Sequence, residues 1–167
     1  MVSYDQFYAR ISAPFRKRPA LLQALRYTNR SMTFLMPVLY VGLLFYVAIM
    51  EPSRMRLLLY VLIPAVSFVV LSVFRSRLNA PRPYETWELQ PLLTKETSGR
   101  SMPSRHVFSA TVISMCLLHQ NGLLGAICLF LSALLAVVRV IGGVHYPKDV
   151  VVGYGLAILV GLGLFFI

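Results

Sequence analysis

Long stretches without a formal charge dominate the pattern of polar and apolar positions. Residues 31–50 and 57–74 contain no charged side chain and are 20 and 18 residues long. At 1.5 Å per residue, a helix of about 20 residues crosses the hydrocarbon core of a bilayer. The pattern therefore predicts a transmembrane helix in each stretch. Pro37 and Pro64 fall inside these stretches, where membrane helices tolerate proline better than soluble ones do.

The second half of the chain contains two further uncharged stretches. Residues 107–138 are too many for one ordinary span, and the polar residues 119–122 interrupt them as a tight turn would. Residues 150–167 are again uncharged. We therefore predict an all-α, multi-pass transmembrane bundle that forms one domain over residues 1–167. Its five spans are expected near 31–50, 57–74, 104–119, 122–140 and 148–167.

The first 30 residues have a different pattern, in which six basic residues alternate with aromatic and aliphatic ones. This mixture is typical of amphipathic helices that lie in the membrane interface. We expect these helices to be broken near Pro14 and Pro19. The segment lacks the uninterrupted apolar stretch and the cleavage site of a signal peptide.

Composition excludes a water-soluble fold, because 57% of the residues are hydrophobic and 13% are charged, against about a quarter charged in soluble domains. The formal net charge is +10. In a membrane protein this excess points to anionic lipids or phosphate-bearing ligands rather than to nucleic acid. The oligomeric state stays open.

Acidic residues are too few and too scattered for a metal cluster. No two of the six share an apolar stretch, whereas a two-metal phosphatase needs grouped carboxylates. We therefore expect neither a metal nor another cofactor. Cys116 and Cys128 lie inside apolar runs, where a thiol behaves as a small hydrophobe.

Five spans place residues 75–106 and 139–149 on the same side of the membrane. A long ordered loop on a small membrane protein is where function is expected. Taken singly, an arginine there could simply set the membrane orientation, and a histidine could have no role. The two segments together bring the following residues to one side: Arg75, Arg77, Arg82, Arg100, Arg105, His106, Arg139, His145 and Asp149.

Three of these residues have an informative local setting. Arg139 follows a long apolar run, at a depth where a charge usually has a partner such as a bound anion. His106 follows Ser104, a good N-cap residue, at a predicted helix N-terminus that would favour an anion. The alternative for Arg139 is a charge that only sets the membrane orientation, and the alternative for His106 is an interfacial histidine without a role.

His145 and Asp149 are four residues apart, with Pro147 between them. If a helix begins near Tyr146, Asp149 can bond to the imidazole, fix its tautomer and make the other nitrogen a better nucleophile or base. The alternative is an ordinary acid favoured by the helix dipole. Phosphoryl transfer needs positive charge, a nucleophile and a proton donor, and arginines, His145 and His106 would supply them without a metal.

Three short motifs resemble those of the type 2 phosphatidic acid phosphatase family, membrane lipid phosphatases that share an active-site pattern with vanadium haloperoxidases. The family motifs read Lys, six residues, Arg-Pro; then Pro-Ser-Gly-His; then Ser-Arg, five residues, His, three residues, Asp. All three occur here in the same order and spacing. The matching residues are Arg75, Arg82 and Pro83; Pro103, Ser104, Arg105 and His106; and Val138, Arg139, His145 and Asp149.

The resemblance implies that His145 attacks phosphorus to form a phosphohistidine, that Asp149 orients it, and that His106 protonates the departing lipid oxygen. It also implies that a set of residues holds the phosphate, namely Arg75, Arg82, Ser104 and Arg139.

The chain departs from the motifs at three positions. Arg75 keeps the charge of the usual lysine but has a planar fork. Val138 replaces a serine and loses a hydroxyl. Arg105 replaces a glycine, which raises the question of the backbone conformation there and offers a further phosphate donor for a diphosphate or an acidic head group.

The expected function is metal-independent hydrolysis of the terminal phosphate of a membrane lipid. Undecaprenyl diphosphate, phosphatidylglycerol phosphate and phosphatidic acid all carry such a phosphate, and an apolar cleft would admit each. The alternative is a non-catalytic membrane protein that binds or moves phosphorylated lipids or anions.

Two arguments conflict on the membrane orientation. The side with the motifs carries 14 basic residues against Arg54 and Arg56 opposite, which by the positive-inside rule favours the cytoplasm. Resemblance to bacterial relatives implies an extracytoplasmic site in the cell membrane, and phosphate binding accounts for at least four of the charges. We expect the extracytoplasmic face.

Overall fold

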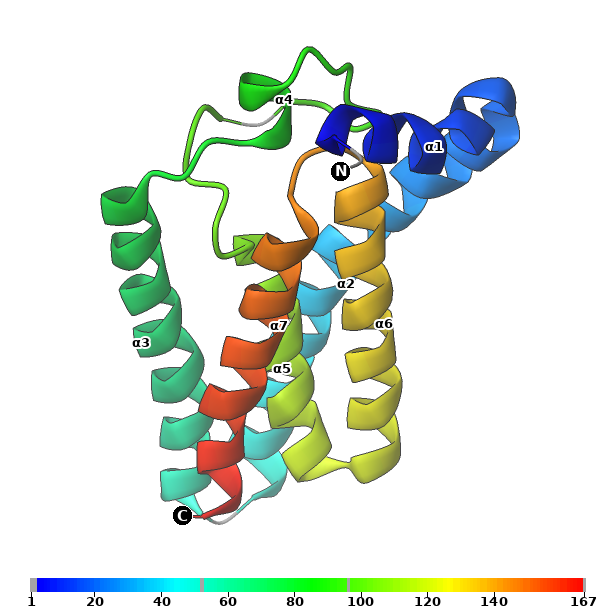
Figure 1. Ribbon diagram of the computed structural model, residues 1–167. Coiled ribbons are helices and arrows are strands. Elements are labelled where there is room, and N and C mark those ends of the chain that lie inside the picture. Colours follow the sequence, from blue (N-terminus) through cyan, green and yellow to red (C-terminus); the bar gives the residue numbers. More distant parts are fainter. Residues whose placement is uncertain (1–2, 52, 96, 167) are drawn as a thin grey trace.

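The computed structural model describes residues 3–51, 53–95 and 97–166, and these contain helices and loops but no strand (Figure 1). The all-α, multi-pass fold predicted from the sequence is confirmed. The helices, in chain order, are α1 (Tyr4–Lys17), α2 (Pro19–Met50), α3 (Arg54–Leu78), α4 (Pro83–Thr86), α5 (Arg105–Gln120), α6 (Gly122–Ile141), α7 (Pro147–Leu162) and the 3₁₀ turn η1 (Gly163–Phe165).

The N-terminal prediction was wrong in one respect, because α1 continues through Pro14 and ends only at Lys17. The break falls at Arg18, whose backbone is extended because a residue that precedes a proline is disfavoured in the helical conformation. Pro19 then starts α2, which runs without interruption to Met50. At 32 residues, α2 is about 48 Å long and exceeds the hydrocarbon thickness, so its basic first turns extend beyond the core.

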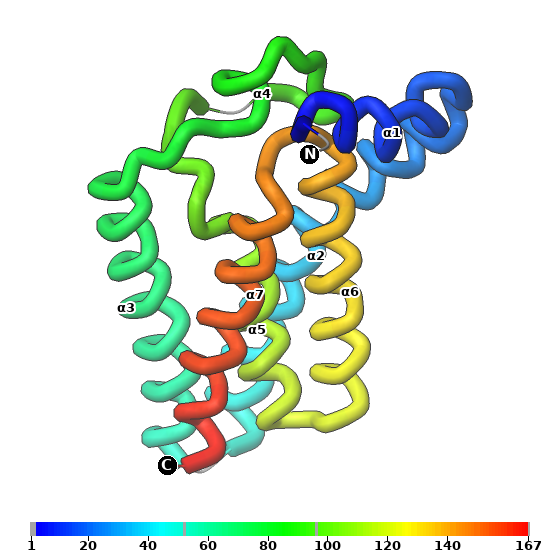
Figure 2. The backbone as a smooth tube through the Cα atoms, in the orientation of Figure 1, coloured from blue at the N-terminus to red at the C-terminus, as the bar shows by residue number. Residues whose placement is uncertain are grey.

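Helix α5 forms the centre of the bundle. It packs against α2, α3, α6 and α7, and ten of its 16 residues are buried. Among the described residues, four helical segments are long and apolar enough to cross a membrane, and they contain α2, α3, α6 and α7. With a length of about 24 Å, α5 is too short to meet that criterion. The segment before α5 descends into the bundle to reach its start (Figures 1 and 2).

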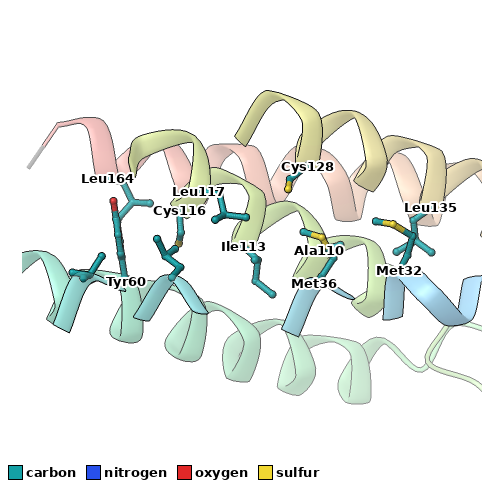
Figure 3. Packing of buried hydrophobic residues seen from close by; sticks show 12 residues of the cluster. Met32, Met36, Tyr60, Ala110, Ile113, Cys116, Leu117, Cys128, Leu135 and Leu164 are labelled. Carbon is teal, nitrogen blue, oxygen red and sulfur yellow. The ribbon is translucent and has the colours of Figure 1, made fainter. Parts of the chain in front are cut away.

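The main core lies between α5 and its neighbours and includes both cysteines, which are free and buried (Figure 3). They act as small apolar side chains beside Met36, Ile113 and Leu135. Helices α5 and α6 approach closely at Gly125, where a Cβ would lie 2.1 Å from the Leu118 backbone. Glycine therefore permits the close contact that the tight turn between these helices requires.

A polar cluster closes the end of the bundle opposite the long loop. The Tyr60 hydroxyl lies 2.7 Å from His119 Nδ1 and 3.2 Å from Gln120 Oε1. The Gln120 amide donates to Glu51, which also pairs with Arg56 at 2.7 Å. His119 therefore has a structural environment of its own, far from the segments that carry the motifs.

Replacing His119 by alanine is expected to leave turnover within about twofold of the wild type. It should lower the free energy of unfolding by about 1 kcal/mol, because a buried hydrogen bond to Tyr60 is lost. Phosphate release and thermal unfolding in detergent check both quantities. A tenfold fall in kcat without loss of stability would contradict the separation of this cluster from the site.

Candidate active site

The helix ends that carry the three motifs meet at one end of the bundle. There α3 and α6 end and α7 begins, and the loop of residues 79–104 passes over them (Figure 2). Helix α1 lies across the same end: Tyr8 packs over Gly143, whose positive φ of 76° suits glycine, and the ring centroid of Tyr4 lies 4.7 Å from that of Tyr146.

His145 and Asp149 form a buried pair, each only 1% exposed. Pro147 occupies the first position of α7, so Asp149 falls in the first turn and its Oδ2 lies 3.6 Å from His145 Nδ1. The same oxygen accepts hydrogen bonds from the Ser101 hydroxyl and from the Tyr146 backbone N–H, the latter at 3.0 Å. Ser101 Oγ also lies 3.4 Å from His145 Nδ1. The carboxylate therefore fixes both the start of α7 and the imidazole.

The His145 imidazole is held in its neutral form. The pKa of His145 is lowered from 6.5 to about 4, mainly by burial and also by the nearby guanidinium groups of Arg139 and Arg82, while Asp149 opposes the shift. A neutral imidazole whose Nδ1 faces a carboxylate presents its Nε2 lone pair for attack. The environment therefore keeps this nitrogen nucleophilic even in mildly acidic solution.

This shift predicts a pH-dependent stability. Between pH 6.5 and 4 the unfolded chain binds a proton on His145 that the folded chain does not, so the free energy of unfolding falls as the pH falls through this range. The loss approaches about 3 kcal/mol below pH 4. Unfolding in detergent can be followed by the fluorescence of Trp87. The wild type should show this fall in the free energy of unfolding, and His145→Gln should not. Identical pH dependence in both proteins would contradict the buried neutral state.

Arg82 links the long loop to the segment before α7. Its guanidinium, 2% exposed, donates to the carbonyl oxygens of Gly99 at 3.2 Å and of Val144 at 3.3 Å. Glu85 secures this region, because its carboxylate accepts from the backbone N–H groups of Arg82 at 2.6 Å and Gly99 at 2.9 Å. The guanidinium thus reaches the residue directly before His145.

Arg75 and Arg139 are buried in the last turns of α3 and α6, where the helix dipole favours a cation. Arg75 donates to the backbone carbonyl of Arg100. Arg139 Nη1 donates to Asn29 Oδ1 of α2 at 3.3 Å. The first and third motifs therefore each contribute a buried cationic side chain to this end of the bundle.

Ser104 precedes α5 as expected, but its side chain does not cap the helix. Its backbone N–H donates to the Asp149 carbonyl at 2.9 Å, and its fully buried hydroxyl has no hydrogen-bond partner among the described residues. Gly153 lets α7 approach the backbone of Ser104 closely, because a Cβ at this position would lie 2.9 Å from the Ser104 carbonyl oxygen. A buried hydroxyl without a partner is costly, unless a ligand bonds to it.

Two cavities that share His106 are lined by the predicted arginines. One, of about 420 Å³, is lined by Ser72, Arg75, Arg82, Thr97, Arg100, Arg105 and His106. The other, of about 440 Å³, is lined by Asn29, Arg30, Thr33, Phe34, His106 and Arg139. The pair of His145 and Asp149 lies buried and is not part of either lining. Arg82 connects the first cavity to this pair through Val144.

The structure shows how the chain accommodates Arg105 and Val138, two of its departures from the motifs. Arg105 is the first residue of α5 and has no positive φ, so the helical backbone accepts a side chain at this position. Its guanidinium lies 5.7 Å from the centroid of the Phe68 ring. Val138 is buried in an apolar cluster with Leu25 and Leu92. The missing hydroxyl at position 138 is thus replaced by apolar packing.

Two residues at this end of the molecule, Ser101 and Asn29, are not expected from the sequence, and Arg100 is expected only as one of several basic residues on this side. Ser101 bonds to Asp149, Asn29 bonds to Arg139, and Arg100, at a positive φ of 53°, lines the cavity of about 420 Å³. Ser101 and Asn29 each contact a residue more than 40 positions away, so no local spacing pattern marks them. Arg100 carries a visible charge, but nothing in the sequence separates it from an orientation charge.

Comparison with known proteins identifies the family. The family model described as "PAP2 superfamily" matches residues 56–167, which include all three motifs. No curated protein sequence matches the chain significantly. Among solved structures, LpxE of Aquifex aeolicus shares 23% identity over 97% of this chain and 94% of that chain, with a TM-score of 0.75.

A second solved structure extends the likeness in fold. A transmembrane PAP2-type phosphatidylglycerolphosphate phosphatase of Bacillus subtilis shares 22% identity over 99% of this chain and 86% of that chain, with a TM-score of 0.70. Both structural matches extend over α1 and α2, which lie entirely outside the family match. The matched motifs, the membrane helices and the fold together show that this chain belongs to the PAP2 superfamily and is an integral membrane lipid phosphatase.

Proposed function

We propose that the protein hydrolyses the terminal phosphate of a membrane lipid phosphate or diphosphate through a phosphohistidine on His145. His145 Nε2 attacks the phosphorus, the bond from phosphorus to the lipid oxygen breaks, and His106 gives that oxygen a proton. Water then cleaves the phosphohistidine and releases inorganic phosphate. Asp149 keeps the imidazole in the reactive tautomer throughout.

One observation carries this proposal: a buried, neutral histidine is held by a carboxylate next to cationic side chains. Phosphoryl transfer depends mainly on positioned positive charge around the equatorial oxygens. Arg75, Arg82 and Arg139 supply this charge, and the Ser104 hydroxyl is available as a further donor. The non-catalytic alternative would use the arginines but gives no reason for the pair of His145 and Asp149.

Three lipid classes fit the proposal, namely undecaprenyl diphosphate, phosphatidylglycerol phosphate and phosphatidic acid. Each combines an apolar tail with a terminal phosphate. The apolar helices suit the tail, and the arginine-lined cavity suits the phosphate. The chemistry described here needs no metal. The described residues contain no group of three or more metal-ligating side chains.

The experiment is phosphate release by the purified protein from these three lipids in detergent, with and without a chelator. We expect release from at least one of them, unchanged by the chelator and inhibited by vanadate, which mimics the five-coordinate phosphorus of the transition state. No release from any lipid, with the lipids still bound, would favour the non-catalytic alternative. Activity lost with chelator and restored by magnesium would overturn the metal-free mechanism.

We place the site at the extracytoplasmic face of the cell membrane. Phosphate binding already accounts for some of the basic residues that the positive-inside rule counts on this side. Two more, Arg16 and Arg26, have a structural role, because they donate to the loop carbonyls of Gln90 and Leu92. An impermeant thiol reagent applied to intact cells should label Lys95→Cys and spare Arg54→Cys, both of which replace exposed side chains. The reverse labelling would place the site in the cytoplasm.

A further inference from the structure

A third cavity adjoins the arginine-lined one. It has a volume of about 360 Å³ and lies between α2, α3, α5 and α6, with Met32, Met36, Phe68, Ile113 and Leu135 among its apolar lining residues. Arg105 and His106 line this groove and also the arginine-lined cavity. These two residues therefore form the boundary between an apolar space and a cationic one.

A lipid phosphate that binds here places its parts in a defined order. The terminal phosphate belongs with Arg75 and Arg82 in the cationic cavity, and the tail belongs in the apolar groove. The bond that breaks must then lie near the boundary, which agrees with the proposed role of His106 as proton donor to the leaving oxygen. Whatever chemical group joins that oxygen to the tail therefore lies against Arg105.

The chemistry at this boundary favours a negative charge. The Arg105 guanidinium is exposed and is oriented by the ring of Phe68, 5.7 Å away, in a cation–π arrangement. None of the described residues that line the cationic cavity is acidic, and it includes Arg100 as well. A guanidinium bonds strongly to a phosphate, whereas the neutral alcohol carbon of a lipid monophosphate offers it no acceptor of comparable strength.

We propose, on the basis of the proposed function, that Arg105 binds the phosphate that stays on the lipid and so makes the enzyme selective for lipid diphosphates. His145 Nε2 attacks the terminal phosphorus, and the bond from that phosphorus to the bridging oxygen breaks. The lipid monophosphate leaves with the bonding electron pair, its former bridging oxygen takes a proton from His106, and Arg105 stabilises the negative charge of the phosphate that stays on the lipid. Water then hydrolyses the phosphohistidine to inorganic phosphate.

The test compares two substrates with the same tail, farnesyl diphosphate and farnesyl monophosphate, in detergent. We expect kcat/KM of the wild type to be at least tenfold higher for the diphosphate. Arg105→Ala should lower kcat/KM for the diphosphate about 30-fold more than for the monophosphate, the scale of a lost charge-assisted hydrogen bond. Arg105→Lys should keep most of the preference. Arg77→Ala, which removes an exposed arginine outside the cavity linings, should leave the ratio unchanged.

The outcomes separate this inference from the proposed function. An equal loss on both substrates, no loss on either, or a wild type that prefers the monophosphate would overturn the selectivity and leave the phosphatase activity standing. Release of phosphate from neither substrate, nor from the three lipids named above, would overturn the proposed function itself. Arg105→Gln, which keeps the aliphatic part of the side chain and a polar end but removes the charge, replaces Arg105→Ala if the alanine variant does not fold.

Discussion

Replacing His145 by alanine is expected to reduce kcat by about 10⁴-fold or more, because the covalent route loses its nucleophile. His145 is buried between Asp149 and two arginines, and no other histidine lies beside that carboxylate in the part of the chain the structure describes. Steady-state phosphate release from the preferred lipid measures the loss. Substrate binding should persist, since the arginines that hold the phosphate remain.

Substitutions around His145 provide matched controls. Asp149→Asn keeps the shape but loses the charge that fixes the tautomer, so it should form the intermediate slowly. Ser101→Ala removes one of the donors to Asp149 and should have a smaller effect than Asp149→Asn. Retention of more than a tenth of the wild-type kcat in a folded His145→Ala protein would contradict the assignment of the nucleophile.

Replacing Arg82 by alanine is expected to cost about 3 kcal/mol of transition-state stabilisation, on the scale of losing a preorganised donor. Its guanidinium is fixed by the carbonyls of Gly99 and Val144, so it needs no reorganisation when charge develops on the phosphoryl oxygens. The loss should appear mainly in kcat, as a fall of roughly 100-fold.

Arg77→Ala is the matched control for this change, since Arg77 is exposed and lies outside the described cavity linings. Thermal unfolding of both variants separates a catalytic loss from a folding defect, because Arg82 also secures the long loop. A near-normal kcat with only a raised KM would mean that Arg82 binds substrate and transition state equally.

Local patterns were sufficient to predict part of the geometry of the candidate site. The spacing of His145, Pro147 and Asp149 determines their geometry, because the proline starts a helix and the carboxylate in its first turn points back to the imidazole. Uncharged stretches likewise marked the helices, since a bilayer requires apolar surface over a fixed length. Arg139 was recognisable because its charge follows such a stretch, and Arg75 because it begins the first motif.

Long-range packing accounts for what the sequence did not reveal. The position of α5 in the bundle depends on its packing against four surrounding helices. A local pattern does not show this packing, so the 16 residues of α5 looked like an ordinary span. Arg26 looked like an interfacial charge, but it bonds to the Leu92 carbonyl 66 residues away. Ser101 reaches Asp149 only because the long loop folds into the bundle. None of these contacts leaves a periodic signal in the chain.

The central claim is that His145 carries the phosphoryl group, and direct trapping tests it most sharply. His106→Ala is mixed with a ³²P-labelled aryl phosphate, whose acidic phenol leaves without a proton donor, and the reaction is stopped in alkaline denaturant, in which phosphohistidine is stable. Label is expected on the peptide that contains His145, and none is expected in the double variant that also carries His145→Ala. Label on any other residue, or equal label in the double variant, would contradict the assignment of His145 as the nucleophile.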